Sequence, residues 1–248
     1  MENVLLVTGA SRGIGAATAV LAAQRGYRVC VNYRQDHAAA QSVVDTIRRR
    51  GGKAEAFAAD VSSETDVRSL FQTLDRQVGR LTALVNNAGT LETQQRVEAM
   101  EAARWHRLWQ TNVLSCFLCT REAIHRMSTR RGGAGGAIVN VSSLAALTGA
   151  PHEYVDYAAS KAAVEAFTRG LAHEVAAEGI RVNGVRPAFI HTDIHARGGE
   201  PDRIERIKPH IPLQRGGQPE EVARAILWLL SDEASYSTGT FLDVTGGK

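Results

Sequence analysis

Short runs of consecutive apolar residues alternate along the chain with longer segments in which apolar residues recur every three or four positions. The short runs are typical of parallel strands buried on both faces, and the longer segments are typical of amphipathic helices. The runs predict strands at residues 4–7, 29–32, 54–59, 81–85, 137–141, 180–185 and 240–244. No break in composition divides the alternation. The pattern therefore predicts one α/β domain, residues 1–248, with a doubly wound parallel sheet and helices on both faces.

Residues 188–218 interrupt this regular alternation with prolines and glycines. A loop of this length in a compact domain usually binds or covers a ligand, so we expect a substrate-loop insertion here. His191 and His195 have the spacing of ligands on one helix face. Because no third ligand is evident, contact with solvent or substrate is favoured over a zinc site.

Composition limits the functions open to the chain. The net charge of +3 over 248 residues is too small to indicate a nucleic-acid partner. No apolar run approaches the roughly 20 residues of a membrane span, and Met1–Asn3 lacks a signal-peptide charge pattern. The chain has three cysteines, and Cys116 and Cys119 fit packing better than a disulfide, redox or metal site. We expect a cytoplasmic protein without a bound metal.

A glycine-rich turn follows the first predicted strand and opens an alanine-rich helix. Its sequence is Thr8-Gly9-Ala10-Ser11-Arg12-Gly13-Ile14-Gly15. A strand, turn and helix in this order place backbone N–H groups at a helix N-terminus, which suits the pyrophosphate of a dinucleotide. The glycine spacing differs from the commoner Gly-x-Gly-x-x-Gly pattern.

The end of the second predicted strand lacks the acidic residue that binds a ribose 2′-hydroxyl in many dinucleotide folds. Asn32, Tyr33 and Arg34 occupy this place, and Arg12 is expected nearby. Two guanidiniums without a carboxylate fit a 2′-phosphate, so the sequence favours NADP over NAD. Asp36 comes too late to bind the ribose unless the strand ends later than predicted.

Tyr157 and Lys161 are four residues apart on a predicted helix and therefore lie on one face. An ammonium beside a phenol favours the phenolate, so we expect the pKa of Tyr157 to lie below its ordinary value of about 10. Such a tyrosine could donate and accept a proton near neutral pH. The spacing alone also arises by chance, so the rest of the chain must support this interpretation.

Further polar residues follow the strands. The segment Asn86–Gly89 comes directly after the fourth predicted strand, at the edge where such sheets bind ligands. Ser142 and Ser143 follow the fifth strand, and Asn112 lies within an apolar helical segment. A buried amide usually has a hydrogen-bond partner, so Asn112 is expected to have one.

In this order and spacing, the motifs resemble those of the short-chain dehydrogenase/reductase family over essentially the whole chain. The matching residues are Thr8, Gly9, Gly13, Gly15, Asn86–Gly89, Asn112, Ser143, Tyr157, Lys161, Thr238–Thr240, Gly246 and Gly247. The resemblance implies a Rossmann-type sheet of seven parallel strands in the order 3-2-1-4-5-6-7. It also implies a homotetramer formed through the helices around Asn112 and Tyr157.

The resemblance further implies hydride transfer between NADP(H) and a carbonyl or alcohol. Tyr157 would exchange the proton, and Ser143 would hydrogen-bond the substrate oxygen. Lys161 would bind the nicotinamide ribose and lower the pKa of Tyr157, and Asn112 would hold a water that connects Lys161 to solvent. The implied cofactor contacts are Gly9, Ser11, Arg12, Gly13, Ile14 and Gly15 at the pyrophosphate and adenosine, Asp60 and Val61 at the adenine, Asn87, Ala88 and Gly89 beside the ribose, and Pro187, Ile190 and Thr192 at the nicotinamide.

Two departures from the family pattern leave alternatives open. Pro187-Ala188 stands in place of the usual Pro-Gly and could narrow the nicotinamide pocket. The interval from Ser143 to Tyr157 is one residue longer than the commonest spacing, so Ser142 remains an alternative catalytic serine.

The functional class and the substrate also have alternatives. A catalytically silent NAD(P)-binding sensor or scaffold is the alternative function, although it would not need the serine, tyrosine, lysine and asparagine together. Leu144, Ala145, Leu147, His152, Glu153 and the 188–218 loop suggest a substrate pocket with apolar and polar walls. Such a pocket is compatible with sugars, acyl ketones, steroids or small aldehydes.

Overall fold

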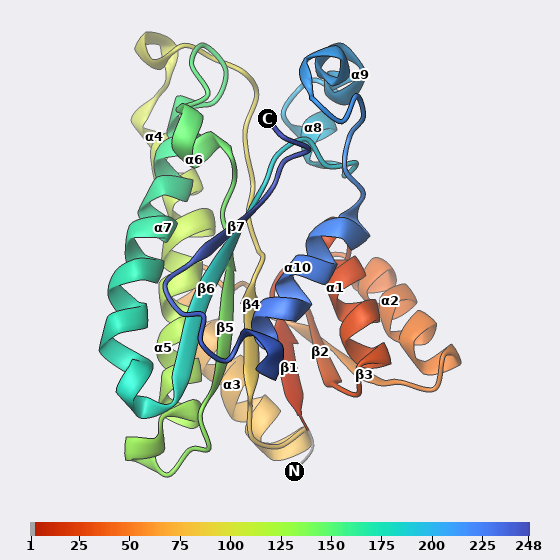
Figure 1. Cartoon of the computed structure of the whole chain (residues 1–248), viewed down its shortest axis with the longest axis vertical. Coiled ribbons are helices and arrows are strands. Elements are labelled where there is room, and N and C mark those ends of the chain that lie inside the picture. The colour runs from red at the N-terminus through yellow and green to blue at the C-terminus, as the bar shows by residue number, and fades with distance from the viewer. Residues whose placement is uncertain (1–2) are drawn as a thin grey trace.

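Seven strands form one sheet within residues 3–248, the part of the chain that the computed structural model describes (Figure 1). They are β1 (Val4–Val7), β2 (Arg28–Tyr33), β3 (Lys53–Ala58), β4 (Ala83–Asn86), β5 (Gly136–Val141), β6 (Ile180–Pro187) and β7 (Phe241–Val244). The strand order is β3-β2-β1-β4-β5-β6-β7, and each neighbouring pair is parallel. The predicted fold class and strand order are confirmed. Met1 and Glu2, on which the expectation of no signal peptide partly rests, lie outside the described residues.

Helices cover both faces of the sheet. They are α1 (Gly13–Gln24), α2 (His37–Arg49), α3 (Glu64–Gln77), α4 (Ala102–Trp109), α5 (Ser115–Met127), α6 (Ala145–Thr148), α7 (Val155–Val175), α8 (Ile194–Arg197), α9 (Arg203–Ile207) and α10 (Pro219–Leu230). A π-helical turn, η2 (Gln110–Leu114), joins α4 to α5, and the 3-10 turns are η1 (Val97–Ala99), η3 (Thr129–Arg131), η4 (Ala176–Glu178), η5 (Lys208–His210) and η6 (Asp232–Ala234). In Figure 1, α1, α2 and α10 cover one face, α5 and α7 lie on the other, and α8 and α9 stand beyond the carboxyl ends of the strands.

The continuous apolar runs reflect two hydrophobic cores, one on each face of the sheet. In β1, Leu5 and Val7 pack into the core shared with α1, α2 and α10, whereas Val4 and Leu6 pack into the core shared with α3, α5 and α7. Side chains alternate between the two faces of a strand, so a strand covered on both faces is apolar at every position. This arrangement directs the polar residues that follow each strand to one edge of the sheet.

The cysteines are buried thiols that belong to this packing. Cys30, Cys116 and Cys119 are free and buried. Burial raises the pKa of Cys30 and of Cys116 to about 12 and also raises the pKa of Cys119. A thiol that keeps its proton is a poor nucleophile, and the burial of these side chains fits the predicted packing role. Within residues 3–248, no helix combines the length and apolarity that crossing a bilayer requires.

Candidate functional site

A cleft of about 900 Å³ runs along the carboxyl ends of the strands. It begins at the turn after β1, passes the ends of β2, β3 and β4, and reaches α7 and the segment after β6. All of the predicted catalytic and cofactor-binding residues line this cleft except Gly15 and Asn112, whereas the residues suggested as substrate-pocket walls, Leu144, Ala145, Leu147, His152 and Glu153, do not line it. Gly15 and Asn112 lie directly behind it, in positions described below.

The glycine turn and the start of α1 form an anion-binding end of the cleft. Gly9 and Gly13 have φ angles of +61° and +55°, a backbone region that favours glycine. A Cβ atom at Gly15 would lie 2.5 Å from Nδ2 of Asn87, which holds the turn by donating to the backbone oxygens of Thr8 (2.9 Å) and Gly9 (3.1 Å). No described side chain caps the N-terminus of α1. Its N–H groups can therefore bind a pyrophosphate.

Two guanidiniums lie where the sequence predicts a 2′-phosphate contact. Nη2 of Arg12 donates to Asp36 (3.0 Å), and Nη1 of Arg34 lies 3.7 Å from Oδ2 of Asp60. The side chains of Arg12 and Arg34 are 39% and 57% exposed, so both pairs are at the surface. Asp36 also caps α2 by accepting the N–H of Ala39. Both arginines are therefore in reach of the cleft, but each already has a carboxylate partner.

Asn32 and Tyr33 differ in what they offer to a ligand. Oδ1 of Asn32 accepts the N–H of Gly9 (3.3 Å), and its Nδ2 donates to the backbone oxygens of Phe57 and Ala59. These bonds use the amide to fix the glycine turn against β2 and β3. Tyr33 ends β2, and its hydroxyl lies 2.7 Å from Nδ1 of His37 at the surface.

Asp60, Val61, Ala88 and Gly89 form the middle of the cleft. Burial raises the pKa of Asp60, but hydrogen bonds from Ser62 and the charge of Arg34 outweigh this effect, and the pKa is lowered overall. Asp60 is therefore a carboxylate at neutral pH and can accept hydrogen bonds from a ligand.

Ser143, Tyr157 and Lys161 come together in the cleft at the ends of β5 and α7. All three side chains line the cleft, and Oγ of Ser143 accepts the N–H of Ala145 (3.1 Å). Nζ of Lys161 lies 5.7 Å from the centroid of the Tyr157 ring and donates to the backbone oxygen of Val141 (2.8 Å). A Cβ atom at Gly89 would lie 3.3 Å from this Nζ. A glycine at this position thus leaves room for the amine beside the cleft.

The prediction that the pKa of Tyr157 lies below its ordinary value of about 10 is wrong. Burial raises the pKa of Tyr157 to about 12, and the hydrogen bond with Ser143 offsets only part of this effect. Burial also lowers the pKa of Lys161 to about 8. The sequence spacing located the pair, but it did not reveal that both side chains leave water, which disfavours the charged form of each. Tyr157 is therefore a neutral phenol at pH 7 and suited to donate a proton.

The geometry separates the two serines that the sequence left open. Ser142 is buried, and its Oγ donates to Oε1 of Glu165 (2.9 Å). Both serines line the cleft, but Oγ of Ser143 accepts a backbone N–H, that of Ala145 (3.1 Å), and Ser143 offsets part of the rise in the pKa of Tyr157. The hydroxyl proton of Ser142 is thus used inside the protein, whereas the hydroxyl of Ser143 can donate a hydrogen bond into the cleft.

Asn112 has the buried partners that the sequence predicted. Its Nδ2 donates to the backbone oxygen of Thr90 (2.9 Å) and to Oγ of Ser160 (3.0 Å), and its Oδ1 accepts the N–H of Thr90 (2.8 Å). It lies in the π-helical turn η2, which the sequence did not reveal because apolar periodicity does not register one wider turn. The amide thereby fixes the segment after β4 beside Lys161, since a Cβ atom at Gly89 would also lie 3.5 Å from Oδ1.

The segment after β6 closes the cleft opposite the glycine turn. Pro187, Ile190 and Thr192 line this side, and a Cβ atom at Gly13 would lie 3.2 Å from Cγ2 of Thr192. His195 is buried, with Nε2 3.1 Å from the backbone oxygen of Ile190. No group of three or more His, Cys, Asp or Glu side chains among the described residues is placed to hold a metal.

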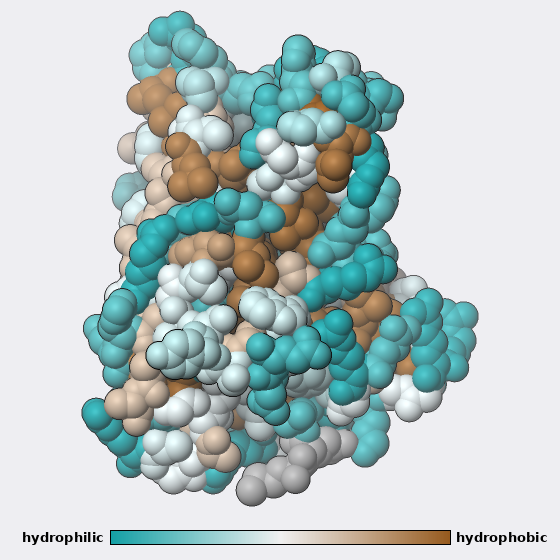
Figure 2. Space-filling view, in the orientation of Figure 1, coloured by the Kyte–Doolittle hydropathy of each residue, from teal (hydrophilic) through white to brown (hydrophobic). Residues whose placement is uncertain are grey.

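Charged side chains hold the α8–α9 segment against the loop before α7. Arg203 pairs with Glu153 and with Glu200 (3.0 Å), and Arg206 pairs with the same two carboxylates, at 3.3 Å for Glu153 and 2.9 Å for Glu200. The guanidinium of Arg203 also stacks on the ring of Tyr154, 4.9 Å from its centroid. The sequence placed Glu153 in a pocket wall, whereas its carboxylate serves these ion pairs. In Figure 2, apolar surface gathers between the α8–α9 segment and the rest of the molecule.

These features fit a dinucleotide. The uncapped start of α1 suits a pyrophosphate, the two arginines suit an additional phosphate, and the glycines let a ligand approach the backbone closely.

The chain is similar to known oxidoreductases over its whole length. A family model described as enoyl-(acyl carrier protein) reductase matches residues 9–248. The uncharacterized oxidoreductase YgfF of Escherichia coli (strain K12) is 59% identical over 245 residues, which cover 99% of each chain. A 3-oxoacyl-[acyl-carrier-protein] reductase of Synechocystis sp. is 41% identical over 247 residues, covering 99% of this chain and 96% of the relative. The crystal structure of a short-chain type dehydrogenase/reductase from Mycobacterium marinum superposes with a TM-score of 0.91 at 34% identity, covering 99% of this chain and 94% of the other.

Proposed function

The chain belongs to the short-chain dehydrogenase/reductase family of oxidoreductases, and we propose that it transfers a hydride between NADP(H) and a carbonyl or alcohol substrate. The observation that carries the proposal is the convergence of Ser143, Tyr157 and Lys161 in one cleft that begins at the glycine turn. A silent nucleotide-binding module would need the turn but not this cluster.

In the proposed mechanism, the nicotinamide supplies or accepts the hydride. During reduction, the Ser143 hydroxyl donates a hydrogen bond to the carbonyl oxygen, and the Tyr157 hydroxyl donates its proton to the same oxygen as negative charge develops there. Because the pKa of Tyr157 is raised to about 12, the phenol carries its proton throughout the neutral range. During oxidation, the proton of the alcohol would pass to the phenolate form of Tyr157, which forms only after the phenol has released its own proton toward Lys161 and solvent.

Lys161 and Asn112 help to return a proton to the Tyr157 oxygen after it has donated its own to the substrate. Lys161 binds the ribose hydroxyls of the nicotinamide half, and its ammonium stabilises the phenolate that remains after proton donation. Asn112 holds a water that connects Lys161 to solvent, close to Gly89. The support for this part is that Nζ of Lys161 and Oδ1 of Asn112 both lie close to Gly89, 3.3 Å and 3.5 Å from the position that a Cβ atom would take there.

We propose NADP rather than NAD because Arg12 and Arg34 stand at the end of β2 without an acid at positions 32–34. Their present pairs with Asp36 and Asp60 are exposed and therefore worth about 0–1 kcal/mol, so a phosphate can replace the carboxylates.

Nucleotide titration tests this preference. Wild type should bind NADPH more tightly than NADH, and Arg12→Ser with Arg34→Ser should remove most of the difference while leaving NADH affinity unchanged. Arg68→Ser, which breaks an exposed pair with Glu64 on α3, is the matched control. Equal affinities of the wild-type protein for the two nucleotides would refute the preference.

The substrate class requires a panel of carbonyl compounds. The Synechocystis relative is named as a 3-oxoacyl-[acyl-carrier-protein] reductase, so a 3-oxoacyl thioester is the first compound to test, followed by a sugar, a ketosteroid and a small aldehyde. We propose that residues 188–218 form the substrate loop, since this segment borders the cleft beside Tyr157.

Following NADPH absorbance tests the reaction. At least one carbonyl compound should be reduced, and Tyr157→Phe should lower turnover by about 10²–10⁴-fold without changing NADPH affinity. Wild-type turnover in the phenylalanine variant would refute the role of Tyr157. NADPH binding without turnover of any compound would favour the silent module.

We propose a homotetramer formed through α4, α5 and α7. Trp109 is 48% exposed and Phe117 is 45% exposed on the helical segment around Asn112, and the Phe117 ring stacks on Phe167 of α7 at 3.8 Å. Exposed aromatic side chains of this kind are typical of subunit interfaces. Light scattering should report four subunits, and Phe117→Glu should dissociate them; a wild-type monomer would overturn the proposal.

We propose a cytoplasmic location because the three free thiols suit a reducing compartment. Fractionation of cells expressing the tagged protein should recover it with cytoplasmic markers. Recovery with an extracytoplasmic fraction would contradict this location.

A further inference from the structure

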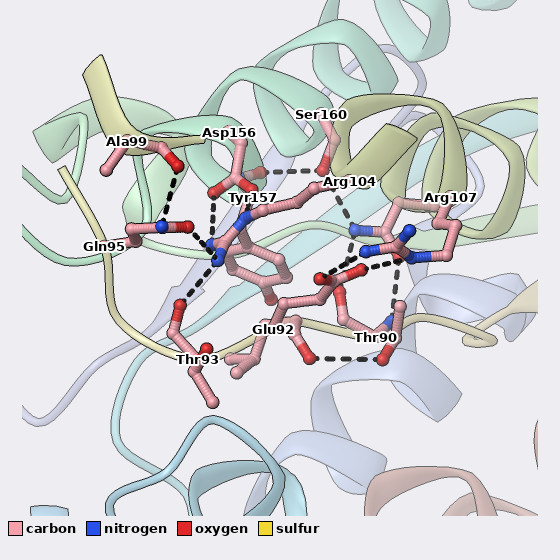
Figure 3. Close-up of polar contacts among 12 residues, drawn as sticks. Thr90, Glu92, Thr93, Gln95, Ala99, Arg104, Arg107, Asp156, Tyr157 and Ser160 are labelled. Atoms are coloured by element: carbon pink, nitrogen blue, oxygen red, sulfur yellow. Dashed lines mark hydrogen bonds and ion pairs between the residues drawn. The ribbon is translucent and has the colours of Figure 1, made fainter. Parts of the chain in front are cut away.

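A buried ion pair lies beside the proposed catalytic tyrosine (Figure 3). The side chains of Arg104 on α4 and Asp156 on α7 are 5% and 0% exposed. Nε of Arg104 lies 2.6 Å from Oδ2 of Asp156, and Nη2 lies 3.3 Å from Oδ1. Removing two charges from water is unfavourable, and an apolar pair of similar volume usually gives equal or greater stability. Fold stability alone therefore does not explain this pair.

Asp156 contacts the backbone of Tyr157 directly. Its Oδ1 accepts the N–H of Tyr157 at 2.9 Å. This N–H lies in the first turn of α7, where the helix itself supplies no carbonyl acceptor. The carboxylate thus fixes the turn from which the phenol extends into the cleft.

The other edge of the guanidinium holds the segment after β4. Figure 3 shows Arg104 between Asp156 on one side and Thr93 and Gln95 on the other. Nη1 of Arg104 donates to the backbone oxygen of Thr93 (2.7 Å) and to Oε1 of Gln95 (3.3 Å). Gln95 is itself anchored, because its N–H donates to the backbone oxygen of Glu153 (3.1 Å). One planar side chain therefore joins residues 93–95 to the start of α7.

We propose that Arg104 and Asp156 are positioning residues that hold Tyr157 in register with the segment after β4. This inference rests on the proposed acid–base role of Tyr157. The same segment is fixed at its other end, where Asn112 bonds both backbone groups of Thr90. The phenol, the Lys161 side of the cleft and the segment between them thereby form one rigid unit. A displacement of about 1 Å in such a unit can lower the rate about 10²-fold.

The decisive variant replaces both charges by apolar side chains, Arg104→Met together with Asp156→Leu. It leaves no unpaired buried charge, so the protein should fold, but the links to Thr93 and to the Tyr157 N–H are lost. We expect kcat to fall about 10²-fold with NADPH affinity unchanged. We also expect the backbone N–H groups of residues 89–96 to exchange with solvent faster than in wild type.

A milder variant covers the case in which the double variant does not fold. Arg104→Lys keeps the charge beside Asp156 but loses the planar fork that reaches Thr93, so kcat should fall about tenfold at unchanged melting temperature. Arg126→Lys is the matched control. Arg126 pairs with Asp75 and Glu122 between α3 and α5, outside the cleft, and its replacement should leave kcat unchanged.

A folded double variant that turns over at the wild-type rate would overturn the inference. If wild type reduces no carbonyl compound, the proposed function fails, and two measurements without substrate decide the positioning role. The first is the ionisation of the Tyr157 phenol, followed by absorbance, with the same titration of a Tyr157→Phe variant subtracted to remove the signal of the other tyrosines. In the double variant, Tyr157 should ionise nearer its ordinary pKa of about 10 than it does in wild type. The faster exchange at residues 89–96 is the second measurement. Unchanged titration and unchanged exchange would both count against the inference.

Discussion

The two halves of the cleft are held together by different interactions. In the nucleotide half, the glycine turn is fixed by backbone conformation at Gly9 and Gly13 and by the neutral amides of Asn32 and Asn87. In the catalytic half, buried charges fix the elements, as in the pair of Arg104 with Asp156. A neutral framework does not respond to protonation, whereas a charged one responds to pH and to loss of a partner.

A second buried pair shows the same character behind Ser143. Nε of Arg186 on β6 lies 2.6 Å from Oε1 of Glu165 on α7, and the neighbouring Ser142 donates to the same carboxylate. Burial raises the pKa of Glu165, but hydrogen bonds from Arg186 and Ser142 outweigh this, and its pKa is lowered overall. The carboxylate therefore stays ionised and ties β5, β6 and α7 together beneath the site.

Lys161 belongs to both halves, so its removal should have the largest effect. Lys161→Ala removes the proposed ribose contact and the cation beside the phenolate, and we expect turnover to fall about 10²–10⁴-fold together with weaker NADPH binding. Steady-state kinetics and nucleotide titration measure the two effects separately. Weaker NADPH binding at wild-type kcat would assign Lys161 to the nucleotide half alone.

Gly15 should affect the nucleotide half only. In Gly15→Ala, the Cβ atom would lie 2.5 Å from Nδ2 of Asn87 and 2.7 Å from the backbone oxygen of Gly9, so the turn must shift. Overpacking of this kind costs about 1–3 kcal/mol, which corresponds to a loss of about 10–100-fold in NADPH affinity. At saturating NADPH, kcat should remain at the wild-type value.

Gly170→Ala is the control for this change, because a Cβ atom there meets nothing within 4 Å on α7. It should leave affinity unchanged and raise stability by about 0.5–1 kcal/mol, the usual gain in a helix interior. If Gly15→Ala lowered kcat as strongly as NADPH affinity, the nucleotide half and the catalytic half of the cleft would be coupled, contrary to what their separate contacts indicate.

The same division explains what could be predicted from the sequence. The seven strands and the glycine turn were predicted from local features, namely apolar runs and glycines, whereas the strand order was implied by the resemblance to the family; the structure confirms the fold and the order. Tyr157, Lys161 and Ser143 were located through motif spacing, and the structure brings them into one cleft. These features could be predicted because the residues that determine them are close together in the sequence.

The remaining features depend on contacts between distant parts of the chain. Arg104 and Asp156 are 52 positions apart, and Arg203 and Glu153 are 50 apart, with no motif that joins them. The raised pKa of Tyr157 has the same origin, because burial depends on the packing of whole elements rather than on the distance to one lysine.

The pH dependence should distinguish the charged half. Burial lowers the pKa of Lys161 to about 8, so its ammonium is present below that pH and is lost above it. Tyr157, whose pKa is raised to about 12, stays protonated over the same range. The rate of carbonyl reduction should therefore fall by about tenfold per pH unit above pH 8 if the ammonium is required.

Initial rates at saturating NADPH measure this decrease above pH 8. In Lys161→Arg, whose guanidinium keeps its charge, the decrease should begin at higher pH, since arginine is not deprotonated in proteins. If the rate of this variant still fell near pH 8, the titrating group would be one other than residue 161.

The smallest effect is expected in the ion pairs of the α8–α9 segment, where Glu200 is 21% exposed and its partner Arg206 is 53% exposed. Hydrogen bonding with Arg206 lowers the pKa of Glu200 to about 2, so this carboxylate is ionised at any working pH. Glu200→Gln should weaken the attachment of the segment by about 0.2–1 kcal/mol and raise KM by about twofold to fivefold at unchanged kcat. Glu205→Gln, which breaks the surface pair with Lys208 in the same segment, is the matched control.

High salt should reproduce the Glu200→Gln effect in wild type, because screening weakens exposed pairs and leaves buried ones nearly intact. If salt instead lowered kcat, the ion pairs that matter for turnover would be accessible to solvent. The contrast between the buried Arg104–Asp156 pair and the partly exposed Arg206–Glu200 pair would then be lost.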